Sequence, residues 1–206
     1  MYHRAMSAAN SDVTAFVLAG GKSTRMGRDK AFVELNGRTL LSRMLDLARS
    51  VAADARIVGD PAKFSSFAPV VDDVFPGCGP LAGIHAALRS SQTELNLALA
   101  VDVPFLTAEF LEYLIAKSRS APALATVART SEGWQPLCAV YRREFAGLAE
   151  RALQAGRYRI DDLFDSAATL VIDEHQLHEQ GFSADLFRNL NTVQELKKAG
   201  DLIRLN

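Results

Sequence analysis

Residues 13–30 read VTAFVLAGGKSTRMGRDK, and this stretch decides which fold we expect. Residues 13–18 are apolar with several β-branched side chains, as in a buried strand, and the run ends abruptly at two glycines. Gly20, Gly21 and Gly27 let the backbone approach a ligand and take positive φ without a clash. Successive N–H groups in such a loop can turn inward and bind an anion. The sequence therefore predicts a phosphate-binding loop at the end of a buried strand.

The residues after the two adjacent glycines carry a local excess of positive charge. Four cations lie within nine residues and a single carboxylate accompanies them: Lys22, Arg25, Arg28 and Lys30 against Asp29. A polyanionic ligand suits such a loop. Two familiar glycine motifs do not fit it, because a P-loop needs a glycine where this chain has Phe16 and a dinucleotide fingerprint needs glycines that are not adjacent.

Composition excludes several classes of protein. The 206 residues are 49% hydrophobic, and a net charge of −1 argues against a general nucleic-acid or membrane-surface binder. No apolar run approaches the roughly 18 residues that a bilayer span needs, and residues 1–12 lack the apolar core of a signal peptide, so we expect a cytoplasmic protein. Cys78 and Cys138 form no C-x-x-C pair, and we expect reduced thiols without a chemical role.

Strand-like and helix-like segments alternate along the chain, which predicts an α/β fold with a largely parallel sheet. The expected strands are 13–18, 56–58, 69–71, 95–101, 123–128, 136–142 and 169–172, and the expected helices are 39–51, 80–88, 110–116, 143–154 and a Thr192-capped helix to about 199. No repeat or long linker divides the chain. We therefore expect one domain over residues 1–206, with residues 1–12 as a flexible N-terminal extension.

Asp102 directly follows the most apolar of these strands, in the sequence AVDVPFL. In open α/β sheets ligands bind beyond the carboxyl ends of strands, so this carboxylate is expected at the same rim as the glycine loop. Pro104 keeps the strand from continuing. A carboxylate here is a hard oxygen ligand of the kind that Mg²⁺ prefers beside substrate phosphates. An Asp that caps a turn before an X-Pro step is an equal alternative on spacing alone.

The loop over residues 18–30 resembles the signature of nucleotidyltransferases that activate sugars and cofactors, and among them the molybdenum cofactor guanylyltransferases. That family's pattern is L-A-G-G-x-S-x-R-M-G-x-D-K, and every fixed position is present. The resemblance implies a three-layer α/β/α fold with a Rossmann-like, mostly parallel but mixed sheet. It also implies that the strand followed by Asp102 is the family's metal-binding motif, with Mg²⁺ as the cofactor.

Two further segments match the family in the expected order. Residues 71–84 follow its D-x-F-P-G-x-G-P-L-A-G pattern, which points to Asp73 as the contact to guanine, whose N1 and N2 edge presents two donors to a carboxylate. The spacing in the family varies by one residue, so Asp72 is the alternative, and a plain turn needs no ligand at all. Residues 187–196 match F-x-N-x-N-T-x-x-E-L, which implies that Asn189 and Asn191 hold the acceptor or complete the metal shell. An ordinary helix-capping sequence is the alternative there.

Less specific features stay open. Residues 134–137 resemble the family's acceptor-side strand, although a buried Trp134 explains the sequence equally well. Arg157 or Arg159 could meet an acceptor phosphate or lie in a solvated loop. His175 and His178 lack a third ligand nearby and are expected on the surface rather than around zinc.

The resemblance implies a reaction between two phosphates. The terminal phosphate of molybdenum-bound molybdopterin attacks the α-phosphorus of GTP, and pyrophosphate leaves. Arg25 and Lys30 would stabilise the triphosphate, and Asp102 would hold the metal. The implied nucleotide-binding residues are Leu18, Ala19, Gly20, Gly21, Lys30, Asp73 and Asp102. Molybdenum-insertion proteins and apo-molybdoenzymes are the implied protein partners, with no nucleic acid and no membrane.

One departure from the family and two rival functions accompany this hypothesis. The family often carries an Asn after its second strand that contacts the nucleotide, where this chain has Gly59 and Asp60. A related cytidylyl branch reads L-A-A-G, so Gly20 removes a methyl near the base and favours guanine. The rivals are a transferase of the same fold that uses CTP or another phosphorylated acceptor, and a non-enzymatic carrier of molybdenum cofactor.

Overall fold

In the computed structural model, residues 10–20, 29–164, 168–190 and 195 are described. Over these residues one sheet contains seven strands: β1 (Asn10–Leu18), β4 (Ala52–Val58), β5 (Val70–Val71), β6 (Leu95–Ala100), β7 (Ala125–Thr130), β8 (Gly133–Arg142) and β9 (Thr169–Asp173). Their order is β5-β4-β1-β6-β8-β7-β9. All neighbouring strands are parallel except where β8 pairs with β6 and β7. The predicted α/β fold with a mostly parallel, mixed sheet is confirmed.

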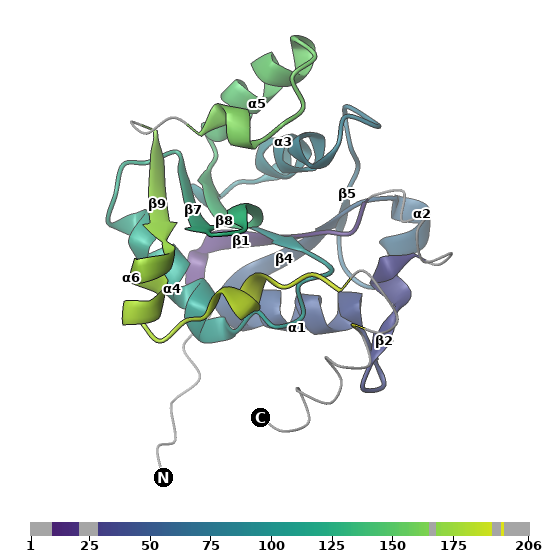
Figure 1. Ribbon diagram of the computed structural model, residues 1–206. Coiled ribbons are helices and arrows are strands. Elements are labelled where there is room, and N and C mark those ends of the chain that lie inside the picture. Colours follow the sequence, from purple (N-terminus) through teal and green to yellow (C-terminus); the bar gives the residue numbers. More distant parts are fainter. Residues whose placement is uncertain (1–9, 21–28, 165–167, 191–194, 196–206) are drawn as a thin grey trace.

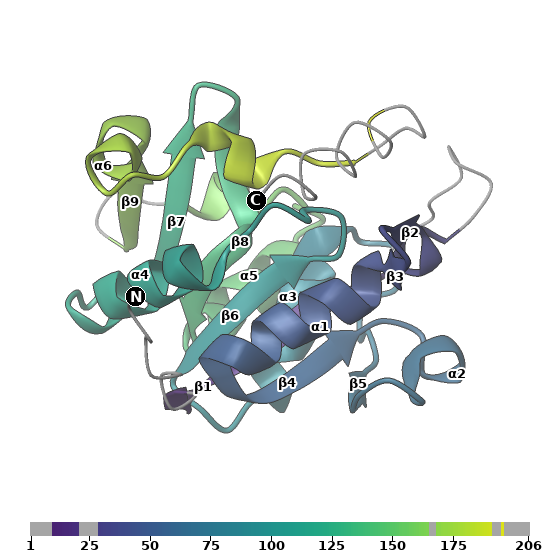
Figure 2. The ribbon, with the colours of Figure 1, turned by 90° about the horizontal axis from the view of Figure 1, so that it is seen from below.

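Helices cover both faces of this sheet (Figure 1). They are α1 (Leu40–Val51), α2 (Pro61–Phe64), α3 (Pro80–Ser90), α4 (Ala108–Arg119), α5 (Phe145–Gln154) and α6 (Glu174–Glu179). Helices α3 and α5 pack together on one face, whereas α1 and α4 lie on the other, where α1 runs along β1 and β4 (Figure 2). The predicted three layers are present.

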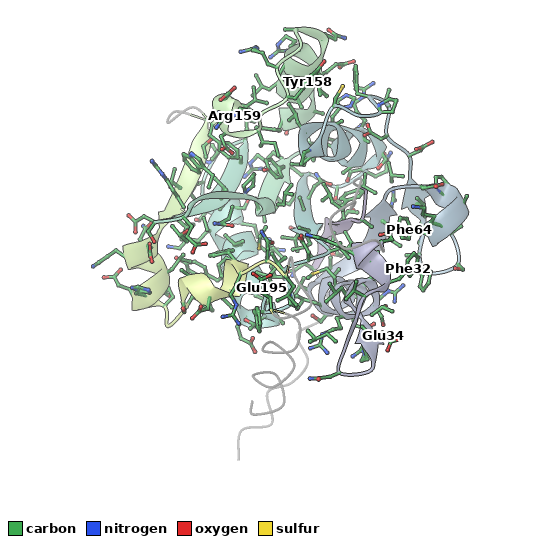
Figure 3. All side chains as sticks on the ribbon, turned by 45° about the vertical axis from the view of Figure 1, so that its right-hand side comes forward. Phe32, Glu34, Phe64, Tyr158, Arg159 and Glu195 are labelled. Carbon is green, nitrogen blue, oxygen red and sulfur yellow. The ribbon has the colours of Figure 1, made fainter. Side chains whose placement is uncertain are left out.

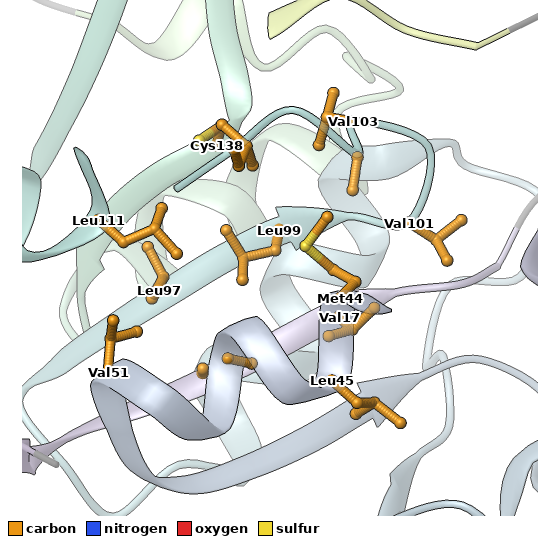
Figure 4. Packing of buried hydrophobic residues seen from close by; sticks show 14 of the residues in the cluster. Val17, Met44, Leu45, Val51, Leu97, Leu99, Val101, Val103, Leu111 and Cys138 are labelled. Atoms are coloured by element: carbon orange, nitrogen blue, oxygen red, sulfur yellow. The ribbon is translucent and has the colours of Figure 1, made fainter. Parts of the chain in front are cut away.

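The central position of strand β1 explains why its sequence is apolar at successive residues rather than at alternate ones. Successive side chains of a strand point to opposite faces of the sheet, so Val13, Ala15 and Val17 join the core under α1 and α4. Phe16 and Leu18 join the second core under α3 and α5. Figure 4 shows part of the first core, in which Met44 of α1 lies beside Val17 of β1 and Leu99 of β6. Both faces of β1 are covered, as in other buried parallel strands.

The N-terminal extension expected over residues 1–12 ends earlier than predicted, because β1 begins at Asn10. The Asn10 side-chain amide donates to the Val51 carbonyl at 2.7 Å, and Arg119 of α4 bonds to Asp12 at 2.6 Å. These polar contacts hold residues 10–12 in the strand, although their sequence is not apolar. Residues 1–9 lie outside the described part of the chain.

Several short elements are absent from the sequence prediction. A hairpin pairs β2 (Glu34–Leu35) with β3 (Arg38–Thr39) through Asn36 and Gly37, whose φ values are +53° and +75°. An Asn-Gly step of this kind is a strong hairpin signal. Three 3₁₀ turns, η1 (Lys30–Phe32), η2 (Asp161–Leu163) and η3 (Ala184–Phe187), and α6 are likewise too short for an apolar period to reveal. The helix expected from Thr192 lies outside the described residues apart from residue 195.

Candidate active site

The carboxyl ends of four parallel strands meet at one rim of the sheet. The Ala19 amide donates to the Val58 carbonyl at 3.0 Å, and the Val101 amide donates to the Leu18 carbonyl at 3.3 Å. The Gly59 amide donates to the Val71 carbonyl at 3.1 Å. Because the chain runs from β1 to β4 and β5 on one side and returns to β6 on the other, the rim between β1 and β6 is the switch point where such sheets bind ligands.

Lys30 and Asp102 meet at this rim. The Lys30 ammonium donates to the Asp102 carboxylate at 2.7 Å, and the two side chains are 21% and 20% exposed. Their positions differ by 72 residues in the sequence, so the fold alone brings them together. Two residues expected to act on the same phosphates are therefore neighbours, one a cation and the other a hard oxygen ligand.

The residues on either side of Lys30 make contacts with α2, the helix that follows β4. Lys30 opens η1, whose N-cap Asp29 accepts from the Ala31 amide at 3.2 Å. The Lys63 ammonium of α2 also pairs with Asp29, at 3.1 Å. The rings of Phe32 and Phe64 stack with centroids 5.7 Å apart, side by side at this edge of the molecule (Figure 3). Helix α2 thus anchors the chain where the glycine-rich loop ends.

Gly20 and Gly59 both lie at the rim, and their surroundings differ. A Cβ on Gly20 would lie 3.9 Å from Gly59 Cα and from the Val58 carbonyl oxygen, which is ordinary contact. A Cβ on Gly59 would lie 2.9 Å from the buried Phe64 ring, which is too close. Position 59 therefore offers its backbone and no side chain, which accounts sterically for the departure from the family's Asn.

The loop from Asp72 to Gly79 joins β5 to α3 and contains the predicted base contact. Asp73 is half-buried, and its Oδ1 accepts from the Phe75 amide at 2.9 Å. Asp72 is exposed, and its Oδ1 accepts from the Asp73 amide at 2.9 Å. The Asp-Asp pair thus stabilises a turn, as the ligand-free alternative expected. A contact between Asp73 and a base stays a prediction.

A pocket of about 370 Å³ opens beside Asp102 on the other side. It lies between the tip of the β7–β8 hairpin and the segment after η3, and it is lined by Glu132, Trp134, Gln135, Phe187, Arg188 and Asn189. The next residue, Leu190, donates its amide to the Asp102 backbone carbonyl at 3.1 Å, which places the pocket-lining segment next to the backbone of Asp102. Half-buried Trp134 packs between the Phe164 ring at 5.0 Å and the Arg129 guanidinium at 4.9 Å.

The predicted site residues divide into two places. Leu18, Ala19, Gly20, Lys30, Asp73 and Asp102 lie on strand ends or loops at the rim, and Asn189 lines the pocket. Gly21, Arg25 and Asn191 lie outside the described residues. The sequence did not point to Glu132, since a single polar residue in a turn carries no distinctive pattern. Trp134 and Gln135 belong to the segment that resembles the family's acceptor-side strand, and they line the pocket. Arg188 was not singled out as a site residue, although it lies inside the matched F-x-N segment.

Other titratable groups bear on what the site can hold. Over the described ranges no group of three or more His, Cys, Asp or Glu side chains could hold a metal ion, and His175 and His178 are exposed on α6. A single carboxylate such as Asp102 still suits Mg²⁺, which is commonly bound by one or two carboxylates together with substrate phosphates.

Burial raises the pKa of the Cys138 thiol, which is therefore inert. None of the described helices is both long and apolar enough to span a membrane.

Comparisons with known proteins agree with this geometry. Residues 15–170 match the model of the MobA-like NTP transferase domain. The chain is 36% identical to the molybdenum cofactor guanylyltransferase of Desulfosudis oleivorans over 93% of this chain and 96% of that protein. It is 30% identical to a probable molybdenum cofactor guanylyltransferase of Carboxydothermus hydrogenoformans over 91% of this chain and 94% of that one.

A solved structure shares the fold closely. The molybdopterin-guanine dinucleotide biosynthesis protein A of Archaeoglobus fulgidus superposes with a TM-score of 0.81 at 27% identity, covering 94% of this chain and all of that one (100%). The family inferred from the loop over residues 18–30 is thereby confirmed. The chain belongs to the molybdenum cofactor guanylyltransferase family, within the MobA-like NTP transferases.

Proposed function

We propose that the chain transfers GMP from GTP to the terminal phosphate of molybdenum-bearing molybdopterin, giving molybdopterin guanine dinucleotide cofactor and pyrophosphate, with Mg²⁺ as the metal. Family membership supports guanylyl transfer in molybdenum cofactor biosynthesis. The single structural observation that carries the proposal is the contact of Lys30 with Asp102 at the rim between β1 and β6. A cation and a carboxylate at this place suit a metal–triphosphate substrate.

The chemistry needs alignment and charge neutralisation rather than a protein nucleophile. An oxygen of the acceptor phosphate forms a bond to the α-phosphorus of GTP while the bond to the β-phosphate oxygen breaks, and pyrophosphate carries away the released charge. The attacking phosphate is already an anion near neutral pH, so no general base is required. Preorganised cations and amides therefore do most of the work, as in other phosphoryl transfers.

Named residues divide this work. Lys30 would leave Asp102 for the phosphates of the incoming nucleotide, and Arg25 would join it there. Backbone amides that follow Leu18 would hold phosphate oxygens. Asp102 would hold Mg²⁺, which when bound supplies positive charge at the α-phosphate. Asp73 would read the guanine edge.

The pocket beside Asp102 is the proposed acceptor site. It offers an indole edge, amide and carboxylate groups and the Arg188 guanidinium, which lies over the Phe105 ring at 4.6 Å. Such a lining suits a planar, polar heterocycle that carries a phosphate. Asn189 belongs to this lining, and Asn191 is proposed to extend it.

Cellular context completes the proposal. GTP and molybdenum-molybdopterin are the proposed small-molecule partners, and molybdenum-insertion proteins and apo-molybdoenzymes are the proposed protein partners. We place the reaction in the cytoplasm.

The test is pyrophosphate release with Mg²⁺ and molybdenum-molybdopterin, offering GTP, CTP, ATP and UTP separately. Asp102→Ala serves as the blank, and Asp46→Ala, which alters an exposed carboxylate on α1, serves as the matched control. We expect release with GTP alone, lost in the blank and kept in the control. Release with CTP would assign the chain to a cytidylyl activity instead. Nucleotide or cofactor binding without any pyrophosphate would favour the carrier.

A further inference from the structure

His85 is a buried polar residue that the reaction above does not use. It lies in α3 and is 3% exposed. Neither Nδ1 nor Nε2 has a hydrogen-bond partner among the described residues. A buried polar group without a partner lowers stability relative to an apolar side chain of similar size. Stability alone therefore gives no reason for a histidine at this position.

The ring of His85 makes one specific contact with the loop after β5. It meets the Phe75 ring at a centroid distance of 5.2 Å and an interplanar angle of 71°, an edge-to-face arrangement. Aromatic pairs of this kind prefer a defined orientation, because the positive edge of one ring faces the negative face of the other. An imidazole N–H can also point at an aromatic face. The contact therefore fixes the orientation of Phe75.

Phe75 in turn holds the carboxylate that is proposed to read the base. Its amide donates to Asp73 Oδ1 at 2.9 Å. His85 also lies close enough to Asp73 for their charges to interact. A chain of contacts thus runs from a rigid, buried helix position through one aromatic ring to a half-buried carboxylate at the rim of the sheet.

We propose that His85 is a positioning residue for guanine recognition, which fixes Phe75 and thereby orients Asp73 toward the N1 and 2-amino edge of the base. The inference rests on the proposed function for the identity of the base. It assigns His85 no contact with substrate. Its effect is on the preference for GTP over inosine triphosphate, because these two nucleotides differ only in the 2-amino group from which Asp73 would accept a hydrogen bond.

The test measures nucleotide binding, which needs no acceptor and no turnover. The dissociation constants of GTP and of inosine triphosphate, which lacks the 2-amino group, are measured by calorimetry with Mg²⁺ for the wild-type chain, His85→Leu, Phe75→Leu and the double variant. We expect the wild-type chain to prefer GTP. Each single variant should lose about tenfold of that preference, the factor that one misplaced hydrogen-bonding group gives. The double variant should lose no more than either single one.

A matched control separates positioning from stability. Thr126→Val removes another buried hydrogen-bonding group without a partner, the Thr126 hydroxyl in β7, far along the sheet from this loop. It should change the melting temperature about as much as His85→Leu does and leave the GTP preference unchanged. If His85→Leu also left the preference unchanged, or if Thr126→Val lowered it equally, the proposal would be overturned.

Failure of the inference and failure of the proposed function give different results. A wild-type chain that releases pyrophosphate from GTP but binds both purine nucleotides equally overturns the inference and keeps the function. A chain that prefers GTP through His85 but releases no pyrophosphate supports the inference and refutes the function. Should His85→Leu fail to fold, Phe75→Leu alone decides, since Phe75 is only half-buried and lies in a largely exposed loop.

Discussion

At the scale of single residues, the contact between Lys30 and Asp102 competes with the ligands that each is proposed to bind, a nucleotide phosphate and a metal ion. The two side chains form a contact of 2.7 Å, and each is about four-fifths buried. A cation held on the carboxylate lowers its affinity for a second cation. The metal is therefore expected to bind well only when a nucleotide draws Lys30 away.

Replacing Lys30 tests this competition directly. We expect Lys30→Ala to lower turnover by about 10²–10³, the usual loss for one preorganised electrostatic group, while the affinity for Mg²⁺ without nucleotide rises because Asp102 loses its partner. Calorimetric titration with Mg²⁺ measures the second effect. Lys63→Ala, which removes the ammonium group that pairs with Asp29, is the control and should leave this affinity unchanged. An unchanged affinity in Lys30→Ala would refute the competition.

The two glycines at the rim should respond differently to an added methyl. Gly20→Ala has room in the fold, so its melting temperature should stay within a degree or two of wild type. Its selectivity between GTP and CTP should fall if position 20 faces the base. Gly59→Ala meets the Phe64 ring at 2.9 Å and should lose about 1–3 kcal/mol of unfolding free energy by overpacking. Thermal unfolding and nucleotide binding of both variants check these outcomes, and a large loss of stability in Gly20→Ala would contradict the geometry.

His85 also predicts a pH dependence of stability. Burial lowers its pKa from the ordinary 6.5, and Arg89 adds to this effect while Glu150 and Asp73 oppose it. Below about pH 6.5 the unfolded chain binds a proton that the folded chain resists, so the unfolding free energy falls as the pH falls through this range. Well above pH 6.5 the His85 imidazole is neutral in both the folded and the unfolded chain, so it no longer makes the unfolding free energy depend on pH.

Denaturant unfolding of the wild-type chain and of His85→Leu between pH 7.5 and pH 5 measures this effect. The wild-type chain should lose stability toward pH 5 more steeply than the variant. The pKa of Asp12 is lowered by its hydrogen bond to Arg119, and the resulting loss of stability belongs to a separate window below its ordinary value of 3.8. Equal slopes for the two chains would show that His85 titrates normally.

At the scale of elements, helix α1 depends on one capping side chain. Thr39 ends β3 and accepts from the Ser42 amide at 3.1 Å, so it joins the hairpin to the helix that covers β1 and β4. Thr39→Ala should lower the unfolding free energy by about 1 kcal/mol, because a partly buried helix start loses its side-chain acceptor. Thr39→Ser keeps the hydroxyl and is expected to recover most of that loss in urea denaturation. A loss as large in the Ser variant would assign the effect to the missing methyl instead.

Elements with a long apolar period were predictable, and those held by a single polar contact were not. Helix α1 repeats apolar residues from Leu40 to Val51, so its bounds follow from the sequence. Helix α6 has one buried residue, Leu177, and is fixed by a capping box between Asp173 and Gln176. A six-residue helix carries too few apolar positions for a period to stand out.

At the scale of the whole molecule, Cys138 reports on opening of the core. It lies in β8 between the two layers of helices, and burial raises the pKa of its thiol. In a Cys78→Ser chain we expect a thiol reagent to label Cys138 only as fast as the molecule unfolds. Labelling followed across a urea series should therefore track the loss of circular dichroism. Fast labelling in native buffer would reveal a local opening of β8.

The sequence by itself determined the family, the succession of most strands and helices along the chain, and the list of candidate site residues. Residues 18–30 carry a loop pattern that depends only on local spacing. Residues 13–18 form an apolar run that predicts a buried strand, and in the structure both faces of β1 are covered. These features are local, and local chemistry can be read from neighbouring residues. The single domain over residues 1–206 and the roles of Arg25, Gly21 and Asn191 stay predictions.

Only the tertiary structure decided which of these residues meet. The sheet order places Asp102 beside Lys30 and puts the pocket between residues 132–135 and 187–189 next to it. It also filled the space at Gly59 with the Phe64 ring and placed His85 against Phe75. Contacts of this kind join positions far apart in the chain, so their distances depend on how strands cross over and pack, which no local pattern contains.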